Sequence, residues 1–248
     1  MSRRFLRADG DYLEITSALV STPPFTMACW FTLDDLTLST DLMAIATDAS
    51  NNQQHALIAD GAVAGDFVVA FTQTTSSVKA KTTTGITQGQ WHHACGVWAA
   101  ATDRRAFIDG GSKGTNTTNR SPSGMNRTQI GQSENNTNRH SGLIAEAAIW
   151  NVALTDGEVA TLAAGISPLR VRPSALVGYW PLFGTSSPEN DYSGKNNDMT
   201  LVATPTQDRH APVGPMFGFD MGWHGGFAGA APPVVTIPYT MAQSGCGL

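Results

Sequence analysis

Short runs of aromatic and β-branched residues recur along the chain, and clusters of Gly, Asn, Asp, Ser and Pro separate them. This spacing is typical of a β-sandwich or barrel and not of alternating strands and helices. Asp-Gly pairs at residues 60–61 and 109–110 provide turns between neighbouring runs. The clearest strands are predicted at residues 25–33, 66–74, 90–98, 104–111, 128–133 and 143–150.

The segment QWHHACGVW alternates with a period of two, which places Trp91, His93, Cys95 and Val97 on one face. In a sandwich, one face of each strand packs against the other sheet. We expect the face that carries these four residues to be the inner one. His92 then lies on the opposite face, so the two adjacent histidines cannot share a metal ion.

One helix is predicted, at residues 155–164. Thr155 and Glu158 stand three positions apart, the spacing at which the two side chains cap each other's backbone N–H groups. Leu162 belongs to the apolar stripe of this helix, and Gly165 marks its end. We expect the helix to close one end of the sandwich.

Two further strands are predicted at residues 175–182 and 199–203, and after them the periodicity disappears. Residues 1–203 are therefore predicted to form one all-β domain, a two-sheet antiparallel sandwich with one short helix. Residues 204–248 are predicted to form an irregular tail, because Gly, Pro and aromatic residues dominate the segment.

This predicted tail contains the segment GPMFGFDMGWHGGFAGAA. Glycines lose much conformational freedom when they become ordered, whereas aromatic side chains favour burial. We expect the tail to be an assembly or anchoring segment in which four aromatic residues contact a partner chain. These residues are Phe217, Phe219, Trp223 and Phe227. The alternative is that the tail packs on its own sandwich.

Composition and charge narrow the classes of partner. Charged residues make up 14% of the 248 residues and the net charge is −5, so the clustered basic residues that bind nucleic acid are not expected. The three cysteines have no CxxC spacing, which favours neither a zinc site nor a disulfide framework. The first residues lack the apolar core of a secretory signal peptide, and no apolar run is long enough for a membrane span.

Several segments resemble, in order, the strands of laminin-G-like (LamG) jelly rolls, which belong to the concanavalin A-like lectin/glucanase superfamily. They are RADGDYLEI, FTMACWFTL, QGQWHHACGVW with AFIDGG, and the most specific match, GLIAEAAIWNVALTDGEVATL. The resemblance runs from Ala8 to Val202 and implies a jelly roll of two packed antiparallel sheets. The superfamily includes enzymes, lectins, adhesion modules and virion proteins, so fold alone does not imply function.

Enzymatic activity is not expected. A glycosidase needs two carboxylates that flank the scissile bond, and the glucanases of the superfamily carry them on one strand. The corresponding strand here, at residues 143–150, offers only Glu146. Trp98, Trp150 and Trp180 are interpreted either as core residues or as rings that stack on sugars.

Calcium is the one cofactor that the resemblance suggests, since many relatives bind it. A calcium site needs clustered oxygen ligands, and Asp9, Asp11 and Glu146 would approach one another if the first strand paired with the strand before the helix. Ala145 stands where the family has an Asp, so one ligand is missing. The alternative is that these three residues are ordinary turn and surface acids.

Two functions follow from these observations. In the first, the chain is a non-enzymatic structural protein of a phage-like viral particle, which decorates or cements a capsid as part of an oligomer or larger assembly. Such a protein is made in the host cytoplasm and needs no signal peptide, which favours this hypothesis. In the second, the chain is a carbohydrate-binding or adhesion module that acts outside the cell or at its surface.

Overall fold

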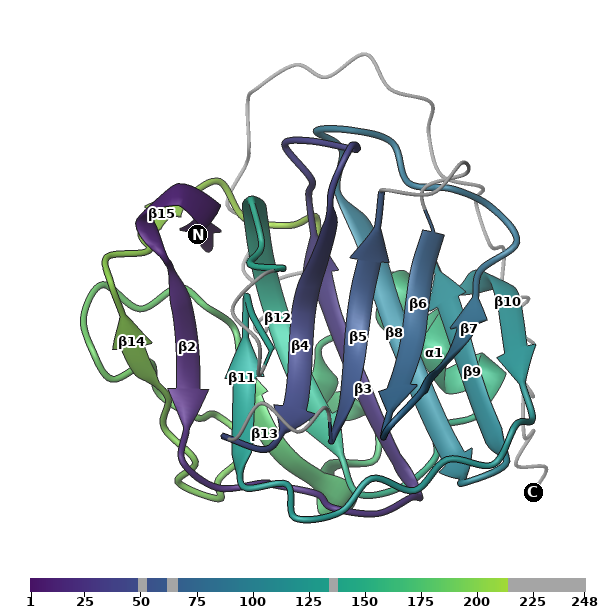
Figure 1. The fold of residues 1–248 in the computed structure, drawn as a ribbon. Helices are drawn as coiled ribbons and strands as arrows, with labels where there is room; N and C mark the ends of the chain where they lie inside the picture. The colour runs from purple at the N-terminus through teal and green to yellow at the C-terminus, as the bar shows by residue number, and fades with distance from the viewer. Residues whose placement is uncertain (49–52, 62–66, 134–137, 214–248) are drawn as a thin grey trace, which may run out of the picture. The chain divides into compact units, whose positions relative to one another are not determined.

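Two antiparallel sheets face each other in the computed structural model, which describes residues 1–48, 53–61, 67–133 and 138–213 (Figure 1). In chain order the strands are β1 (Ser2–Phe5), β2 (Tyr12–Ile15), β3 (Phe25–Phe31), β4 (Ser39–Ala46), β5 (Gln54–Asp60), β6 (Phe67–Gln73), β7 (Ser77–Lys81), β8 (His92–Ala100), β9 (Asp103–Ile108), β10 (Gly111–Asn116), β11 (Arg127–Ile130), β12 (Gly142–Trp150), β13 (Leu176–Trp180), β14 (Thr200–Val202) and β15 (Thr206–Asp208). Helix α1 spans Asp156–Ala163, and 3-10 turns span Arg7–Asp9, Pro168–Arg170 and Pro173–Ala175.

Within these residues the first sheet has eight strands and the second has seven. The first runs β10-β9-β8-β3-β12-β1-β15, and β13 also pairs with β12. The second runs β14-β2-β11-β4-β5-β6-β7. This arrangement confirms the predicted all-β antiparallel sandwich with one short helix.

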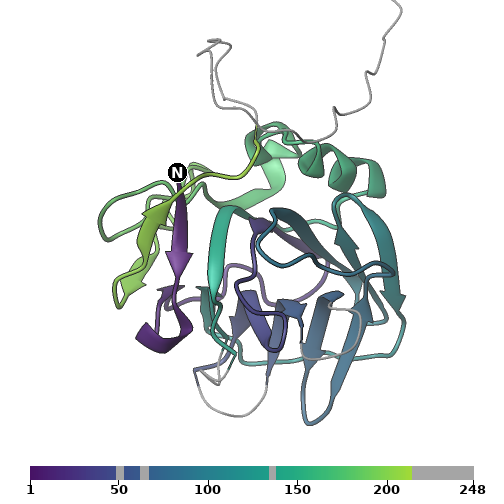
Figure 2. The same ribbon diagram turned by 90° about the horizontal axis from the view of Figure 1, so that it is seen from above.

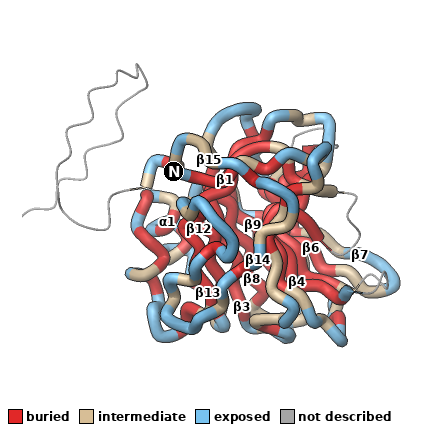
Figure 3. Tube along the Cα trace, turned by 90° about the vertical axis from the view of Figure 1, so that its left-hand side faces the viewer, coloured by how far each residue is buried: buried red, intermediate tan, exposed pale blue. Residues whose placement is uncertain are grey.

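The main core lies between the two sheets. Alternate residues of each sheet point into it, among them Phe31 and Trp98 from the first sheet and Met43 and Leu57 from the second. All four are fully buried. Figure 3 shows the two layers of buried strands with exposed connections around them. Burial of apolar surface on this scale is the main term that stabilises the fold.

A second core covers the outer face of the eight-stranded sheet, where α1 lies (Figure 2). Val159 and Leu162 of the helix pack there against Cys95 and Val97 of β8. The expectation that Trp91, His93, Cys95 and Val97 face the other sheet is therefore wrong. Ala94 and Trp98, which alternate with them along the chain, pack in the core between the sheets. The helix lies against this sheet face and not at one end of the sandwich.

The predicted cap of α1 is confirmed. The Thr155 side chain accepts a hydrogen bond from the backbone N–H of Glu158, and the Glu158 carboxylate accepts one from the backbone N–H of Thr155. Gly165 follows with a left-handed φ of 84°, a conformation that glycine adopts without steric cost. Local chemistry therefore determines both ends of this helix.

The sandwich continues past residue 203, where the tail was expected to begin. Residues of β15 pair in antiparallel register with β1, so that Thr206 lies opposite Arg4. The carbonyl oxygen of Pro205 also accepts a hydrogen bond from Arg3 at 3.1 Å. Residues 204–208 thus complete one edge of the eight-stranded sheet. Within the described ranges, no helix is long and apolar enough to cross a membrane.

Candidate functional site

A pocket of about 330 Å³ opens at one end of the sandwich, and a buried histidine of β5 lies in its wall. Its lining residues are Ser21, Thr22, Pro23, His55, Ala99, Ala100, Ala101, Ser121 and Pro122. They come from the β2–β3 connection, the end of β8 with the β8–β9 turn, the β10–β11 connection and β5. This volume is at the lower end of the range for small-molecule sites.

Strand alternation turns His55 toward the core. Its neighbours at two-residue spacing, Leu57 and Ala59, are core residues between the sheets. The imidazole packs against the rings of Phe25 and Trp98, at centroid distances of 4.9 and 5.7 Å. As a result, only 1% of His55 is exposed.

The two ring nitrogens of His55 have different surroundings. Nδ1 lies 2.9 Å from the hydroxyl oxygen of Thr72 on the neighbouring strand β6. Trp98 donates a hydrogen bond from Nε1 to the same hydroxyl, also at 2.9 Å. Nε2 is buried and has no hydrogen-bond partner in the described part of the chain. A buried polar atom without a partner costs about 1–3 kcal/mol, so a ligand that satisfies it gains affinity.

Burial also determines the charge of this site. Burial, together with the nearby Arg104 guanidinium, lowers the pKa of His55 to about 3. The imidazole is therefore neutral at physiological pH. Arg104 holds the wall of the pocket in place, because it donates hydrogen bonds to the carbonyl oxygens of Ala101 and Thr118 at 2.7 and 2.8 Å.

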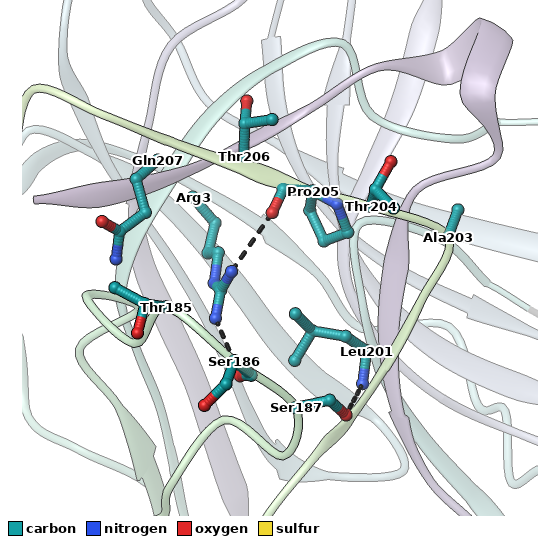
Figure 4. A pocket seen from close by; sticks show the side chains of 10 residues that line it. All are labelled: Arg3, Thr185, Ser186, Ser187, Leu201, Ala203, Thr204, Pro205, Thr206 and Gln207. Carbon is teal, nitrogen blue, oxygen red and sulfur yellow. Dashed lines mark hydrogen bonds between the residues drawn. The ribbon is translucent and has the colours of Figure 1, made fainter.

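A larger depression, of about 550 Å³, lies beside β15 (Figure 4). Arg3 forms part of its wall, and its guanidinium is paired with Glu189 at 2.7 Å. The same side chain donates hydrogen bonds to the carbonyl oxygens of Pro205 and Ser186. None of the residues that line this depression has a buried side-chain nitrogen or oxygen without a partner. The one charged side chain of its lining, Arg3, is therefore engaged in holding the chain together.

The three acids suggested for calcium are not brought together. In the described ranges, no group of three or more His, Cys, Asp and Glu residues could hold a metal ion. Asp9 is exposed, whereas Asp11 accepts hydrogen bonds from the backbone N–H groups of Leu6 and Thr204. The 3-10 turn before Asp11 carries the chain from one sheet to the other, so β1 and not β2 pairs with β12.

Glu146 takes part in a different network. It occupies an irregular stretch of β12 with a left-handed φ of 54°, a conformation that is uncommon for a residue other than glycine. Its carboxylate accepts a hydrogen bond from the Tyr179 hydroxyl at 2.6 Å and lies 3.2 Å from His210 Nε2. This network ties β12 to β13 and to the segment after β15.

The structure also shows where the tryptophans and the paired histidines lie that the sequence suggested as binding residues. Trp98, Trp150 and Trp180 are fully buried, so they are core residues and cannot stack on a sugar. His92 and His93 point to opposite faces as expected, with His92 bonded to Asp109 and His93 packed against Trp30. The predicted anchor residues lie outside the described residues; they are Phe217, Phe219, Trp223 and Phe227.

His55 did not stand out in the sequence because β5 was not predicted as a strand. Its segment QHALIAD is rich in alanine, which is depleted in strands. The available signal was a single histidine at the start of a short apolar run. The pocket itself depends on three connections that are far apart in the sequence.

The two facing antiparallel sheets, with the helix directly after the long strand β12, define a concanavalin A-like jelly roll. The family model described as the concanavalin A-like lectin/glucanases superfamily matches residues 7–160, and the chain belongs to this superfamily. The laminin-G-like resemblance is thereby confirmed.

Several solved structures share the fold. Domain 4 of AbnA, an extracellular arabinanase from Geobacillus stearothermophilus in complex with arabinotriose, is 23% identical, with a TM-score of 0.52 over 60% of this chain and 71% of that one. The heptameric SAP-like pentraxin from Limulus polyphemus is 14% identical, with a TM-score of 0.55 over 81% and 92% of the two chains. Tailspike protein 2 of bacteriophage CBA120 is 16% identical, with a TM-score of 0.53 over 72% of this chain and 29% of the tailspike chain. Comparison of the sequence with curated proteins gave no match.

Proposed function

We propose that this chain is a carbohydrate-binding domain and that its sugar site is the pocket beside His55. The observation that carries the proposal is the buried Nε2 of His55, which has no partner in the described part of the chain. A polar atom in this position favours a ligand that forms a hydrogen bond with it. The bound arabinotriose in the AbnA domain supports the same class of ligand for the fold.

The chemistry of the pocket suits a small sugar. Pro23, Pro122 and the alanines of the β8–β9 turn offer apolar surface to C–H groups of a sugar ring. Ser21, Thr22 and Ser121 offer hydroxyl groups to its edge. A few polar groups in a mostly apolar pocket are typical of sites that bind and orient a small molecule.

Binding without hydrolysis is part of this proposal. No Asp or Glu lines the pocket among the residues that the structure describes, whereas glycoside hydrolysis normally needs a pair of carboxylates. A glycan that binds the domain is therefore expected to be recovered intact. Release of new reducing ends during incubation would contradict this expectation.

The first prediction concerns His55→Phe. This substitution keeps an aromatic ring in the core and removes Nε2, so a glycan identified on an array should bind about 3- to 10-fold more weakly, as expected for the loss of one hydrogen bond. Titration calorimetry with that glycan measures the change. The matched control is His93→Phe, since His93 is also buried and has an unpartnered Nδ1 but does not line the pocket.

The control variant should bind like the unmodified chain. If His55→Phe and His93→Phe both bind the glycan as tightly as the unmodified chain, the sugar site lies elsewhere. The carbohydrate-binding proposal itself fails if no glycan on the array binds the unmodified chain.

We also infer a role in a viral particle, in which the domain serves as a decoration or cement protein. The sequence of residues 214–231 supports this second function, because a segment so rich in aromatic residues and glycine suits contact with another subunit. The tailspike comparison supports a fold compatible with a virion. The two functions are compatible, because a virion component can also bind glycans.

The second prediction tests this role by deletion of residues 214–248. The shortened chain keeps β15 and should unfold at the same temperature as the full chain, because residues 1–216 form one compact unit. It should also contain fewer subunits per particle than the full chain in size-exclusion chromatography with light scattering. If the two chains have the same oligomeric state, the segment is not an assembly anchor. A deletion that starts at residue 204 is the control, and it should lower the unfolding temperature because β15 is lost.

A further inference from the structure

We propose that Thr72 fixes His55 in the tautomer that carries its proton on Nε2, so that the pocket selects an uncharged ligand through an acceptor oxygen. Thr72 does not line the pocket and therefore acts as a positioning residue. This inference rests on the proposed function and names the ligand class of the same site. Suitable acceptors are a sugar hydroxyl, a ring oxygen or an acetamido carbonyl.

The hydrogen bonds of the Thr72 hydroxyl decide the tautomer. A hydroxyl donates one hydrogen bond and accepts up to two, whereas an indole N–H only donates. Trp98 Nε1 therefore occupies an acceptor position of Thr72. The side-chain partner left for the hydroxyl proton, among the described residues, is His55 Nδ1 at 2.9 Å. When Nδ1 accepts this proton, the neutral ring carries its own proton on Nε2.

The opposite tautomer is disfavoured because it would leave the Thr72 hydroxyl proton without an acceptor. Thr72 is fully buried, so water cannot replace the missing partner. An unsatisfied buried donor of this kind shifts the equilibrium by roughly tenfold or more. The ring also has little freedom to turn, since Phe25 and Trp98 stack on each other 4.8 Å apart and both contact it.

The charge of the pocket favours a neutral ligand. None of its nine lining residues is Asp, Glu, Lys or Arg. A carboxylate or ammonium group that entered the pocket would lose its hydration without gaining an ion pair from the lining residues. The Arg104 guanidinium behind the wall already donates hydrogen bonds to Ala101, Asn116 and Thr118. His55 remains neutral, because its pKa is lowered to about 3 by burial. In this proposal the pocket offers the Nε2–H of His55 as one neutral donor, together with hydroxyl groups and apolar surface.

The third prediction compares Thr72→Val with Thr72→Ser in the full chain. Valine has nearly the shape of threonine but lacks the hydroxyl, whereas serine keeps the hydroxyl. Long-range ¹H–¹⁵N spectra should give the Nε2–H tautomer for His55 in the unmodified chain and in the serine variant. The valine variant should gain the Nδ1–H form. Its affinity for the array glycan should fall about twofold, because the binding tautomer drops from nearly all to about half of the population. The serine variant should bind nearly as well as the unmodified chain.

A pair of ligands tests the selection for neutral groups. A glucuronic acid glycoside and the corresponding primary amide have the same number of heavy atoms and differ in charge, and the amide should bind more tightly. Tighter binding of the acid would overturn the inference, as would an Nδ1–H tautomer in the unmodified chain. Circular dichroism of the valine variant shows whether it folds, and the serine variant provides the comparison if it does not.

The failure of this inference is distinguishable from that of the proposed function. If His55→Phe weakens glycan binding and a folded Thr72→Val does not, the site stands and the tautomer argument is wrong. If no glycan binds any variant, the sugar site fails, while the spectra still decide the tautomer.

Discussion

Replacement of Arg3 by Met is expected to lower the free energy of unfolding by about 3–5 kcal/mol, because it leaves a buried carboxylate without its counter-ion. The Arg3 and Glu189 side chains are only 2% and 1% exposed and lie 2.7 Å apart. The substitution also removes the donors that bind the carbonyl oxygens of Pro205 and Ser186. Two loops and the edge strand β15 should therefore loosen together.

Urea unfolding of Arg3→Met and Arg4→Met measures this effect against a matched control. Arg4 is the next residue of the same strand, and its ion pairs with Asp34 and Asp208 are about one-third exposed. Exposed pairs contribute about 0–1 kcal/mol, so the control should change little. Equal losses in the two variants would mean that burial of the Arg3 pair does not matter.

Acidification from about pH 6 to about pH 4.5 is expected to destabilise the fold by about 2–3 kcal/mol per pH unit. Burial lowers the pKa of His93 and His140 to about 4 and that of His55 to about 3. Unfolded histidines titrate near pH 6.5. Between these values the unfolded chain binds more protons, so stability falls as the pH falls.

One buried carboxyl opposes this trend. Burial raises the pKa of Asp41 to about 7, so the folded chain holds a proton there that the unfolded chain releases above about pH 4. This group stabilises the fold as the pH falls through 7. The three imidazoles outweigh the one carboxyl, so the unfolded chain binds about two protons more than the folded chain in this pH range.

Urea unfolding at a series of pH values measures directly how the free energy of unfolding changes per pH unit. The variant His93→Phe removes one of the three imidazoles. It should lower the proton difference between the unfolded and folded chains by about one, and the pH dependence should become correspondingly weaker. A midpoint that stays constant or rises between about pH 6 and about pH 4.5 would contradict the prediction. Histidine C2 proton resonances should then also titrate near pH 6.5 in the folded chain.

Much of the architecture could be predicted because it depends on residues that are close together in the sequence. The capping pair Thr155 and Glu158 predicted α1 within one residue at each end. The turn at Asp109 and Gly110 was also predicted correctly, and both residues have the left-handed φ values that such a hairpin turn requires. These features depend on neighbours in the sequence, and the same residues form them in the structure.

Strands β4 and β5 were missed for a physical reason. Both are buried along nearly their whole length, and each contains two alanines. They therefore show no clear alternation and have few β-branched residues. Their identity as strands comes from pairing with each other and with β6 and β11. The position of His55 could not be known without this pairing.

The sequence by itself determined the all-β class, the single helix, the approximate order of the strands and the family resemblance. It could not determine which face of β8 meets the other sheet, because both faces are buried and the hydrophobic pattern does not distinguish them. Only the tertiary structure brought Thr72 and Trp98 to His55, paired Arg3 with Glu189, and kept Asp9, Asp11 and Glu146 apart. These contacts join residues distant in the chain, so they depend on how the sheets pack and not on local preference.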